Sequence, residues 1–368
     1  MKNQTLFAIS FLFMMLSCEN KKKYDYDNKI LGDWVFEKEN PKIKNRFYSD
    51  YGYSFEKNGI CYSKPGYFKT LEKDNERQTI FYGTKTKYKV VDDSLLMYNL
   101  VSKKWFSVKI DSVNTKILRL RFEKDVVLEF SKQNYSANEK DDFDKIIISK
   151  SPCFGSCAIN DLEIHKNGSV LYNGHYYNLK NGFYTSKIQP EEFKKIEHDF
   201  KKTHYLELKN EYSAKWTDDQ EISITFIKDN KIIKTITDYG RQSPKFFRIT
   251  YEPITFLYQH LKLKKIESIK DYRKNLYYEF ERGNKSIQLS FSEGFYLSNL
   301  LGDAKPSNKS FHPEYVIKYD NDLNVTKIKT DGQYFKVYFK DKNPMVLDLG
   351  FNFIERNNLK ERLKLKKE

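Results

Sequence analysis

The sequence predicts a mainly β protein with α+β parts. Short apolar runs typical of strands follow one another along the chain, with Gly, Asn and Asp turn signals between them. Aromatic residues make up 16% of the chain, which excludes a disordered polypeptide. A mean hydropathy of −0.74 and a single long apolar run exclude a polytopic membrane protein. The elements predict three regions: an antiparallel barrel, a sheet with two helices on one face, and a β-rich part ending in a helix.

The net charge of +15 raises the question of a nucleic-acid partner. The excess of Lys and Arg is spread over the three regions and forms no basic stripe of the kind that follows a phosphate backbone. We therefore expect no nucleic-acid binding.

Residues 1–17 are typical of a signal peptide, because Lys2 precedes an apolar run from Leu6 to Leu16 that is too short to span a bilayer. The Met-Leu-Ser-Cys sequence that ends at Cys18 resembles the lipobox of bacterial lipoproteins. That resemblance implies acylation of Cys18, palmitate included, and attachment to a membrane outside the cytoplasm. The outer membrane or the cell surface is expected, with the periplasmic side as an alternative. An ordinary signal peptide that ends near a Cys is the competing interpretation.

Residues 28–132 predict a small antiparallel β-barrel, because regularly spaced short strands with turns between them are typical of barrels and sandwiches. Leu118, Leu120 and Phe122 alternate with arginines, which indicates a strand with one buried face. The expected strands are Ile30 to Glu37, Tyr51 to Glu56, Ile60 to Ser63, Gln78 to Tyr82, Thr86 to Val91, Leu95 to Leu100, Trp105 to Ile110, Ile117 to Phe122 and Val126 to Phe130.

Gly32 and Trp34 form a Gly-x-Trp sequence at the start of this region. It resembles the start of lipocalin-like domains, and the resemblance implies that Trp34 plugs one end of the barrel, with Arg119 or Arg121 packed over it. A barrel of eight strands is just wide enough for its own side chains to fill. We therefore favour a filled barrel over one that holds a small apolar ligand. Cys61 is expected to be a buried, unreactive thiol.

Residues 133–142 are polar and predict a linker, and residues 143–263 predict two hairpins, each followed by a helix. Asn167-Gly168 is a strong hairpin signal, and a two-residue turn there would place His165 opposite Val170. A helix is expected from Gln189, and a last helical stretch from Ser243 to Leu263 should be kinked or split at Pro253. This order argues for an antiparallel sheet with both helices on one face.

Cys153, Phe154, Gly155 and Cys157 stand before the second strand of this region. They resemble the Cys-Phe-Gly-x-Cys mark of a family of bacterial domains of unknown function, often found in exported proteins. The resemblance names a domain and implies no activity. In an oxidising compartment the two cysteines are most simply a structural disulfide, which we expect here. A thiol-redox centre would need a Cys-x-x-Cys sequence in a thioredoxin-like setting, which is missing.

Residues 271–368 predict further hairpins, with tight turns at Gly283-Asn284 and Asp331-Gly332 and a closing helix from Phe351 to about Lys364. The stretch from Ser292 to Pro313 contains two glycines and two prolines and is expected to be an irregular surface loop. The region is either a third domain or an extension that packs on the central one.

No nucleotide loop, Ser-His-Asp spacing, HExxH sequence or paired-carboxylate motif is recognised in the sequence, and no metal or cofactor is expected. The favoured interpretation is a lipid-anchored, non-enzymatic binding or assembly module. Its candidate partners are the membrane, through acylated Cys18, and a protein, a glycan or a small apolar ligand. The alternative is an exported hydrolase or thiol-redox enzyme with a site assembled from distant residues.

Overall fold

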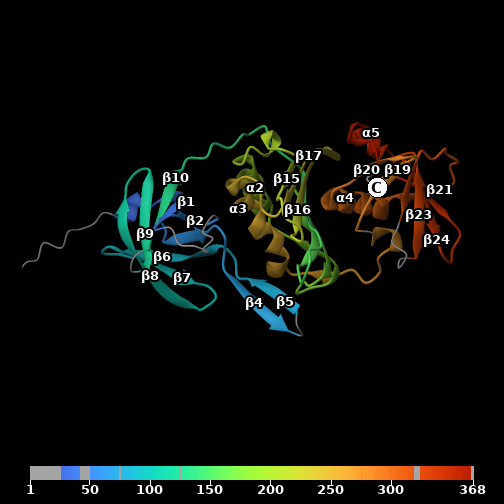
Figure 1. Cartoon of the computed structure of the whole chain (residues 1–368). Helices are drawn as coiled ribbons and strands as arrows, with labels where there is room; N and C mark the ends of the chain where they lie inside the picture. The colour runs from blue at the N-terminus through green and yellow to red at the C-terminus, as the bar shows by residue number, and fades with distance from the viewer. Residues whose placement is uncertain are drawn as a thin grey trace, which may run out of the picture.

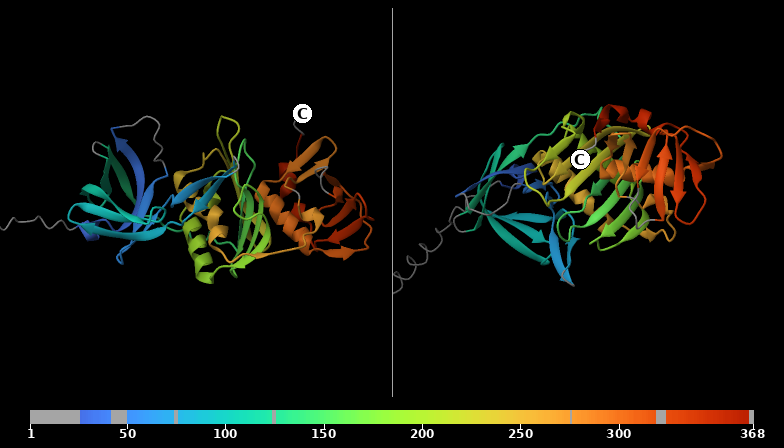
Figure 2. Two further views of the ribbon diagram at one scale, coloured as in Figure 1. Left: turned by 90° about the horizontal axis from the view of Figure 1, so that it is seen from below. Right: turned by 45° about the vertical axis from the view of Figure 1, so that its right-hand side comes forward.

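The computed structural model describes residues 26–41, 50–73, 76–123, 126–274, 276–318 and 324–365. A barrel, a central sheet and a C-terminal sheet follow one another in a row, as Figures 1 and 2 show from several sides. This order confirms the mainly β fold class, the N-terminal antiparallel barrel and the sheets that follow it.

Eight antiparallel strands close the barrel in the order β1-β10-β9-β8-β7-β6-β3-β2. A short helix, α1 (Tyr26–Lys29), precedes it. The strands are β1 (Gly32–Asn40), β2 (Gly52–Phe55), β3 (Ile60–Ser63), β6 (Lys85–Val91), β7 (Ser94–Asn99), β8 (Lys104–Val113), β9 (Ile117–Glu123) and β10 (Val126–Gln133).

Large side chains fill the barrel interior. Each member of its core is at most 8% exposed, and Trp34, Cys61, Leu118, Leu120 and Phe130 are fully buried. Burial raises the pKa of the Cys61 thiol to about 12, so this thiol stays protonated and unreactive at neutral pH.

The side chain over the Trp34 ring is not an arginine, as the lipocalin-like resemblance implied. The Nζ atom of Lys132 lies 5.2 Å from the centre of that ring. Arg119 and Arg121 point to the outer surface, since they alternate with buried Leu118 and Leu120, and they pair with Glu129 and Asp111.

One expected barrel strand belongs to a separate hairpin. Strand β5 (Glu76–Phe81), expected at Gln78 to Tyr82, pairs only with β4 (Phe68–Lys73), which the sequence did not indicate. We call this β4-β5 hairpin the arm. Figure 1 shows it leaving the barrel toward the central sheet.

The central sheet has eight strands in the order β15-β17-β16-β11-β12-β13-β14-β18. The helix α2 (Pro190–Lys201) and the helix α3 (Lys245–Tyr251) bury phenylalanines against one face of it, as predicted. The chain turns from α3 into the 3₁₀ helix η2 (Glu252–His260) around Pro253, and a second 3₁₀ helix, η1 (Tyr205–Glu207), follows α2. The strands are β11 (Lys145–Lys150), β12 (Ile159–His165), β13 (Ser169–Tyr176), β14 (Gly182–Lys187), β15 (Glu211–Ser213), β16 (Glu221–Lys228), β17 (Lys231–Tyr239) and β18 (Lys264–Lys265).

The hairpin at Asn167-Gly168 forms, but its register differs by one residue from the prediction. Ile164, not His165, lies opposite Val170, because the turn contains three residues instead of two. The two-residue turn usual for Asn-Gly therefore gave the wrong partner for His165.

The C-terminal part is a second eight-stranded sheet, in the order β21-β25-β24-β23-β22-β19-β20-β26. The predicted closing helix is shorter than expected and consists of α5 (Phe353–Arg356) and the 3₁₀ helix η4 (Leu359–Arg362). The strands are β19 (Glu279–Arg282), β20 (Lys285–Gln288), β21 (Lys305–Ser307), β22 (Tyr315–Lys318), β23 (Val325–Thr330), β24 (Tyr334–Phe339), β25 (Met345–Asp348) and β26 (Lys364–Leu365).

The stretch from Ser292 to Pro313 is not a surface loop. Most of it is the buried helix α4 (Phe291–Asp303), whose N-cap Ser290 accepts a hydrogen bond from the Glu293 amide. Helix α4 packs against β11 and β16, on the face of the central sheet opposite α2 and α3. One core therefore joins Ile147 and Ile227 of the central sheet to α4 and the C-terminal sheet, so the C-terminal part packs on the central one.

Candidate functional site in the junction between barrel and central sheet

The residues singled out in the sequence belong to different parts of the chain. Cys18 falls outside the described residues. Gly32 and Trp34 stand at the start of β1, where the Trp34 indole donates a 2.6 Å hydrogen bond to the carbonyl of Ile30. Cys153 and Cys157 form a disulfide with their Cα atoms 5.9 Å apart, in the loop between β11 and β12 of the central sheet. The structure therefore places Trp34 and the disulfide in different parts of the fold.

A pocket of about 500 Å³ lies where the barrel meets the central sheet. Both parts contribute to it, and sequence reasoning did not find it. It is lined by Asp50, Tyr51, Pro65 and Phe68 from the barrel side and by Trp216, Asp219, Gly240, Arg241, Gln242, Arg248 and Glu252 from the central part. We call it the junction pocket.

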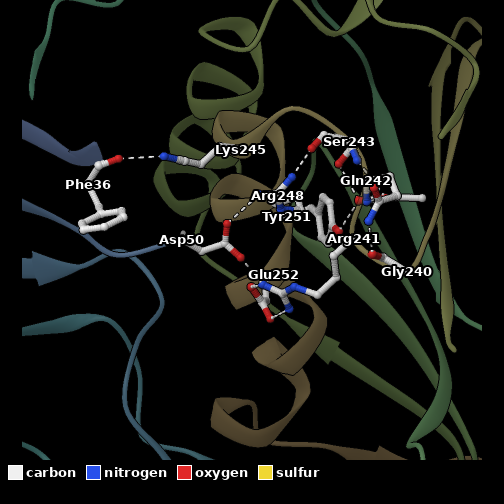
Figure 3. Close-up of polar contacts among 11 residues, drawn as sticks. Phe36, Asp50, Gly240, Arg241, Gln242, Ser243, Lys245, Arg248, Tyr251 and Glu252 are labelled. Carbon is white, nitrogen blue, oxygen red and sulfur yellow. Dashed lines mark hydrogen bonds and ion pairs between the residues drawn. The ribbon is translucent and has the colours of Figure 1, made fainter. Parts of the chain in front are cut away.

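The Asp50 carboxylate holds the two sides of the junction pocket together (Figure 3). It accepts hydrogen bonds from Arg241 at 2.5 Å and from Arg248 at 2.8 Å. Arg241 is also paired with Glu252. Burial by itself would raise the pKa of Asp50, but the hydrogen bonds from Arg248 and Arg241 outweigh it and lower the pKa. Asp50 is therefore charged at neutral pH.

Asp238 shapes the turn that carries Arg241. Its carboxylate, 1% exposed, accepts hydrogen bonds from the backbone amides of Gln242 and Ser243 and from the hydroxyls of Ser243 and Tyr251. Gly240 and Arg241 both have left-handed backbone angles, with φ of +67° and +61°. A buried carboxylate with four donors holds such a turn in one conformation.

The arm forms a second contact across the junction. Phe68 and Phe81 of the arm pack on Phe256 of η2, with ring centres 5.3 and 5.4 Å from it. The Gln259 side chain accepts a hydrogen bond from the Phe81 amide and donates one to the carbonyl of Thr79. The junction thus has an apolar contact beside the charged one.

Trp216 presents an aromatic face at the junction pocket. The side chain is 55% exposed, and its indole nitrogen donates a 3.1 Å hydrogen bond to the carboxylate of Asp219. Gly240 lies close to the ring, since an added Cβ atom there would be 3.2 Å from Trp216 Cζ2. The ring is therefore restrained by Asp219 and Gly240 while more than half of the residue remains exposed.

On its opposite face the central sheet carries buried polar side chains under α4. Glu163 pairs with Lys145 at 3.0 Å and accepts a 2.6 Å hydrogen bond from Asn299 of α4. Burial works to raise the pKa of Glu163, but His165 and Lys145 outweigh it and lower the pKa to about 2. This carboxylate therefore stays ionised and ties α4 to the sheet.

His165 and His175 have different carboxylate partners. His165 lies 2.5 Å from Glu163, and His175 lies 2.7 Å from Asp161, which also accepts a hydrogen bond from Ser149. Among the described residues, no group of three or more His, Cys, Asp or Glu side chains is placed to hold a metal ion. Within that same part of the chain, no helix is long and apolar enough to cross a membrane.

The sequence of the central part matches a known family over residues 144–258, from the start of β11 to η2. The matching family is described as a domain of unknown function, DUF6438. The matched segment supplies every central lining residue of the junction pocket, from Trp216 to Glu252.

No curated protein matches the chain. One solved structure, of an uncharacterized protein from Bacteroides eggerthii DSM 20697, is similar with 15% sequence identity and a TM-score of 0.19. The similarity covers 28% of this chain and 98% of that one.

Proposed function

We propose that this protein is an exported, lipid-anchored binding protein of non-enzymatic role, and that it holds an uncharged oligosaccharide in the junction pocket. The observation that carries the proposal is Trp216, an exposed ring hydrogen-bonded to Asp219 at a pocket that also has charged side chains in its lining. Aromatic faces carry partial negative charge and attract the C–H face of a sugar ring, while neighbouring polar groups bind its hydroxyls.

The charges of the junction pocket support an uncharged ligand. Its two arginines are paired with Asp50 and Glu252, and Asp219 accepts from Trp216. A strongly anionic ligand would have to compete with these carboxylates for Arg241 and Arg248. A sugar hydroxyl, in contrast, both donates and accepts, so it adds to the existing pairs without breaking them.

A glycan array probed with the full chain in detergent tests the ligand class. We expect binding to neutral oligosaccharides, and we expect Trp216→Ala to weaken it at least tenfold. Trp105→Ala is the matched control, because Trp105 is 43% exposed on β8 of the barrel, and this variant should bind normally. Failure of the wild-type chain to bind any glycan, or equal loss in the two variants, would contradict the proposal.

The anchor is proposed from the lipobox-like sequence at Cys18. A chain held by acyl groups at its first mature residue needs no spanning helix, because several acyl chains anchor a protein firmly. Metabolic labelling with a fatty-acid probe should mark the wild-type protein and leave Cys18→Ala unmarked and released from the membrane fraction. Label that persists on the variant, or a variant that stays in the membrane, would refute the anchor.

A further inference from the structure

Nine large hydrophobic side chains among the described residues are exposed, and four of them lie at one end of the central sheet: Phe154, Tyr176, Leu179 and Trp216. The strand pairing brings their loops together. Lys150 at the end of β11 lies opposite Asn160 and Ile222, and Ile159 lies opposite Tyr176. Three of these four side chains are aromatic, and their loops leave the same end of the sheet.

Phe154 is the most exposed of the nine, at 86%, and it stands in the loop closed by the Cys153–Cys157 disulfide. A disulfide that closes so short a loop limits the positions that Phe154 can take. An exposed apolar ring in a restrained loop is preorganised, so a ligand that binds it pays less conformational entropy to order the loop.

The loop of Phe154 is also bonded to the loop of Trp216. The Phe154 amide donates a 3.3 Å hydrogen bond to the carbonyl of Asp218, two residues after Trp216. The Gln220 side chain donates to the carbonyls of Ser151 and Ala158, at 2.6 and 3.0 Å, on the two sides of the disulfide. The two aromatic side chains are therefore presented by one connected surface that continues from the junction pocket.

We infer that the ligand is a chain of several sugar units, and that it extends from Trp216 in the junction pocket to a second aromatic subsite at Phe154. This inference rests on the proposed function. It assigns to the disulfide loop the role of lengthening the binding site beyond the pocket.

The surroundings of the two rings favour a sugar chain over a protein partner. The centre of a protein interface is a continuous apolar patch with few charges. Here the loop of Trp216 carries Asp218, whose carbonyl accepts from the Phe154 amide, and Asp219, whose carboxylate accepts from the Trp216 indole, so polar groups accompany both rings. A sugar chain repeats apolar faces and hydroxyl edges at intervals, which suits separated rings with polar groups between them.

The test compares ligands of two lengths. Disaccharides and hexasaccharides of the cello-, malto-, xylo- and chito- series are titrated calorimetrically into the full chain and into four variants, Trp216→Ala, Phe154→Ala, Phe154→Tyr and Leu206→Ala. We expect Phe154→Ala to weaken hexasaccharide binding about three- to tenfold and to leave disaccharide binding unchanged. Phe154→Tyr, which keeps the ring, should bind like the wild type. Leu206→Ala is the control, because Leu206 is 38% exposed on η1, away from this surface.

The outcomes separate the two proposals. If Trp216→Ala weakens both ligands and Phe154→Ala changes neither, the junction pocket stands and the second subsite is wrong. If Phe154→Ala weakens the disaccharide as much as the hexasaccharide, Phe154 belongs to one compact site and the extension is refuted. If no saccharide binds the wild-type chain, the proposed function fails and this inference fails with it.

Discussion

Replacement of Asp50 by Ala should loosen the contact between the barrel and the central sheet. The Asp50 side chain is 11% exposed and accepts from Arg248, 12% exposed, and from Arg241, 50% exposed. A hydrogen bond between charged, mostly buried groups contributes about 1.5–3 kcal/mol, whereas a more exposed pair contributes roughly 0.5 kcal/mol. Because Arg241 also keeps Glu252, most of the loss comes from Arg248. We expect a total of about 2–3 kcal/mol.

A double-mutant cycle on Asp50→Ala and Arg248→Ala, followed by urea unfolding of the full chain, measures this coupling directly. We expect about 2 kcal/mol of interaction energy. The exposed pair of Arg77 and Glu72, at 3.1 Å in the arm, is the matched control and should give less than about 0.5 kcal/mol. A coupling for Asp50 and Arg248 as small as that of the control would refute the reasoning.

The pH dependence of this contact has a definite sign. Because the pKa of folded Asp50 is lowered, the carboxylate contributes its full stabilisation above its ordinary pKa of about 3.9. The contribution is lost as the pH falls through the folded value. The wild type and Asp50→Ala should therefore differ in stability at neutral pH and converge in acid.

Three further predictions concern the central sheet. Replacement of both Cys153 and Cys157 by Ala should lower the melting temperature, because closure of so short a loop contributes about 2 kcal/mol; full alkylation of both thiols in the native protein would contradict the bond. Glu163→Gln should lower the free energy of unfolding in urea by about 3 kcal/mol above pH 4.3. The difference between wild type and variant should vanish as the pH falls through about 2, and a difference that persisted there would contradict an ionised Glu163 in the folded protein. Gly240→Ala should destabilise the protein by about 1–2 kcal/mol, because φ is +67° at this position and the added Cβ would lie 2.6 Å from the Cβ of Ala214. The substitution should also change the fluorescence of Trp216, and an unchanged spectrum would show that the position of the ring does not depend on Gly240.

The barrel and the first central hairpin were predictable because their signals are local. Alternation such as that of Leu118 and Leu120 identifies a half-buried strand, and Asn167-Gly168 marks a turn wherever the chain is placed. The register of that hairpin could not be predicted, because the same sequence can form a two-residue or a three-residue turn. One extra residue in the turn shifts every cross-strand pair by one position.

The sequence did not predict helix α4, because its two glycines make room for side chains that lie outside the helix. An added Cβ at Gly294 would lie 3.0 Å from Tyr278, and one at Gly302 would lie 2.6 Å from Arg273. Both glycines allow close packing, although in the sequence they are typical of a loop.

The junction pocket was hidden for a related reason. Asp50 and Arg241 are separated by 191 positions, and no spacing rule connects a residue before a barrel strand with a turn that far along the chain. The exposure of Trp216 and Phe154 could not be predicted either, because large aromatic side chains are mostly buried and nothing in the local sequence marks these two as exceptions.

The position of α4 means that the matched family segment and the folding unit have different limits. Residues 144–258 contain the central strands from β11 to β17, but the cover of their second face comes from residues 291–303. A protein cut after residue 258 would expose Ile147 and Ile227 to water and leave Glu163 without Asn299. Any other chain that carries this segment with the same apolar face must supply its own cover for that face. A truncated protein built on the match should therefore extend through α4, to residue 303.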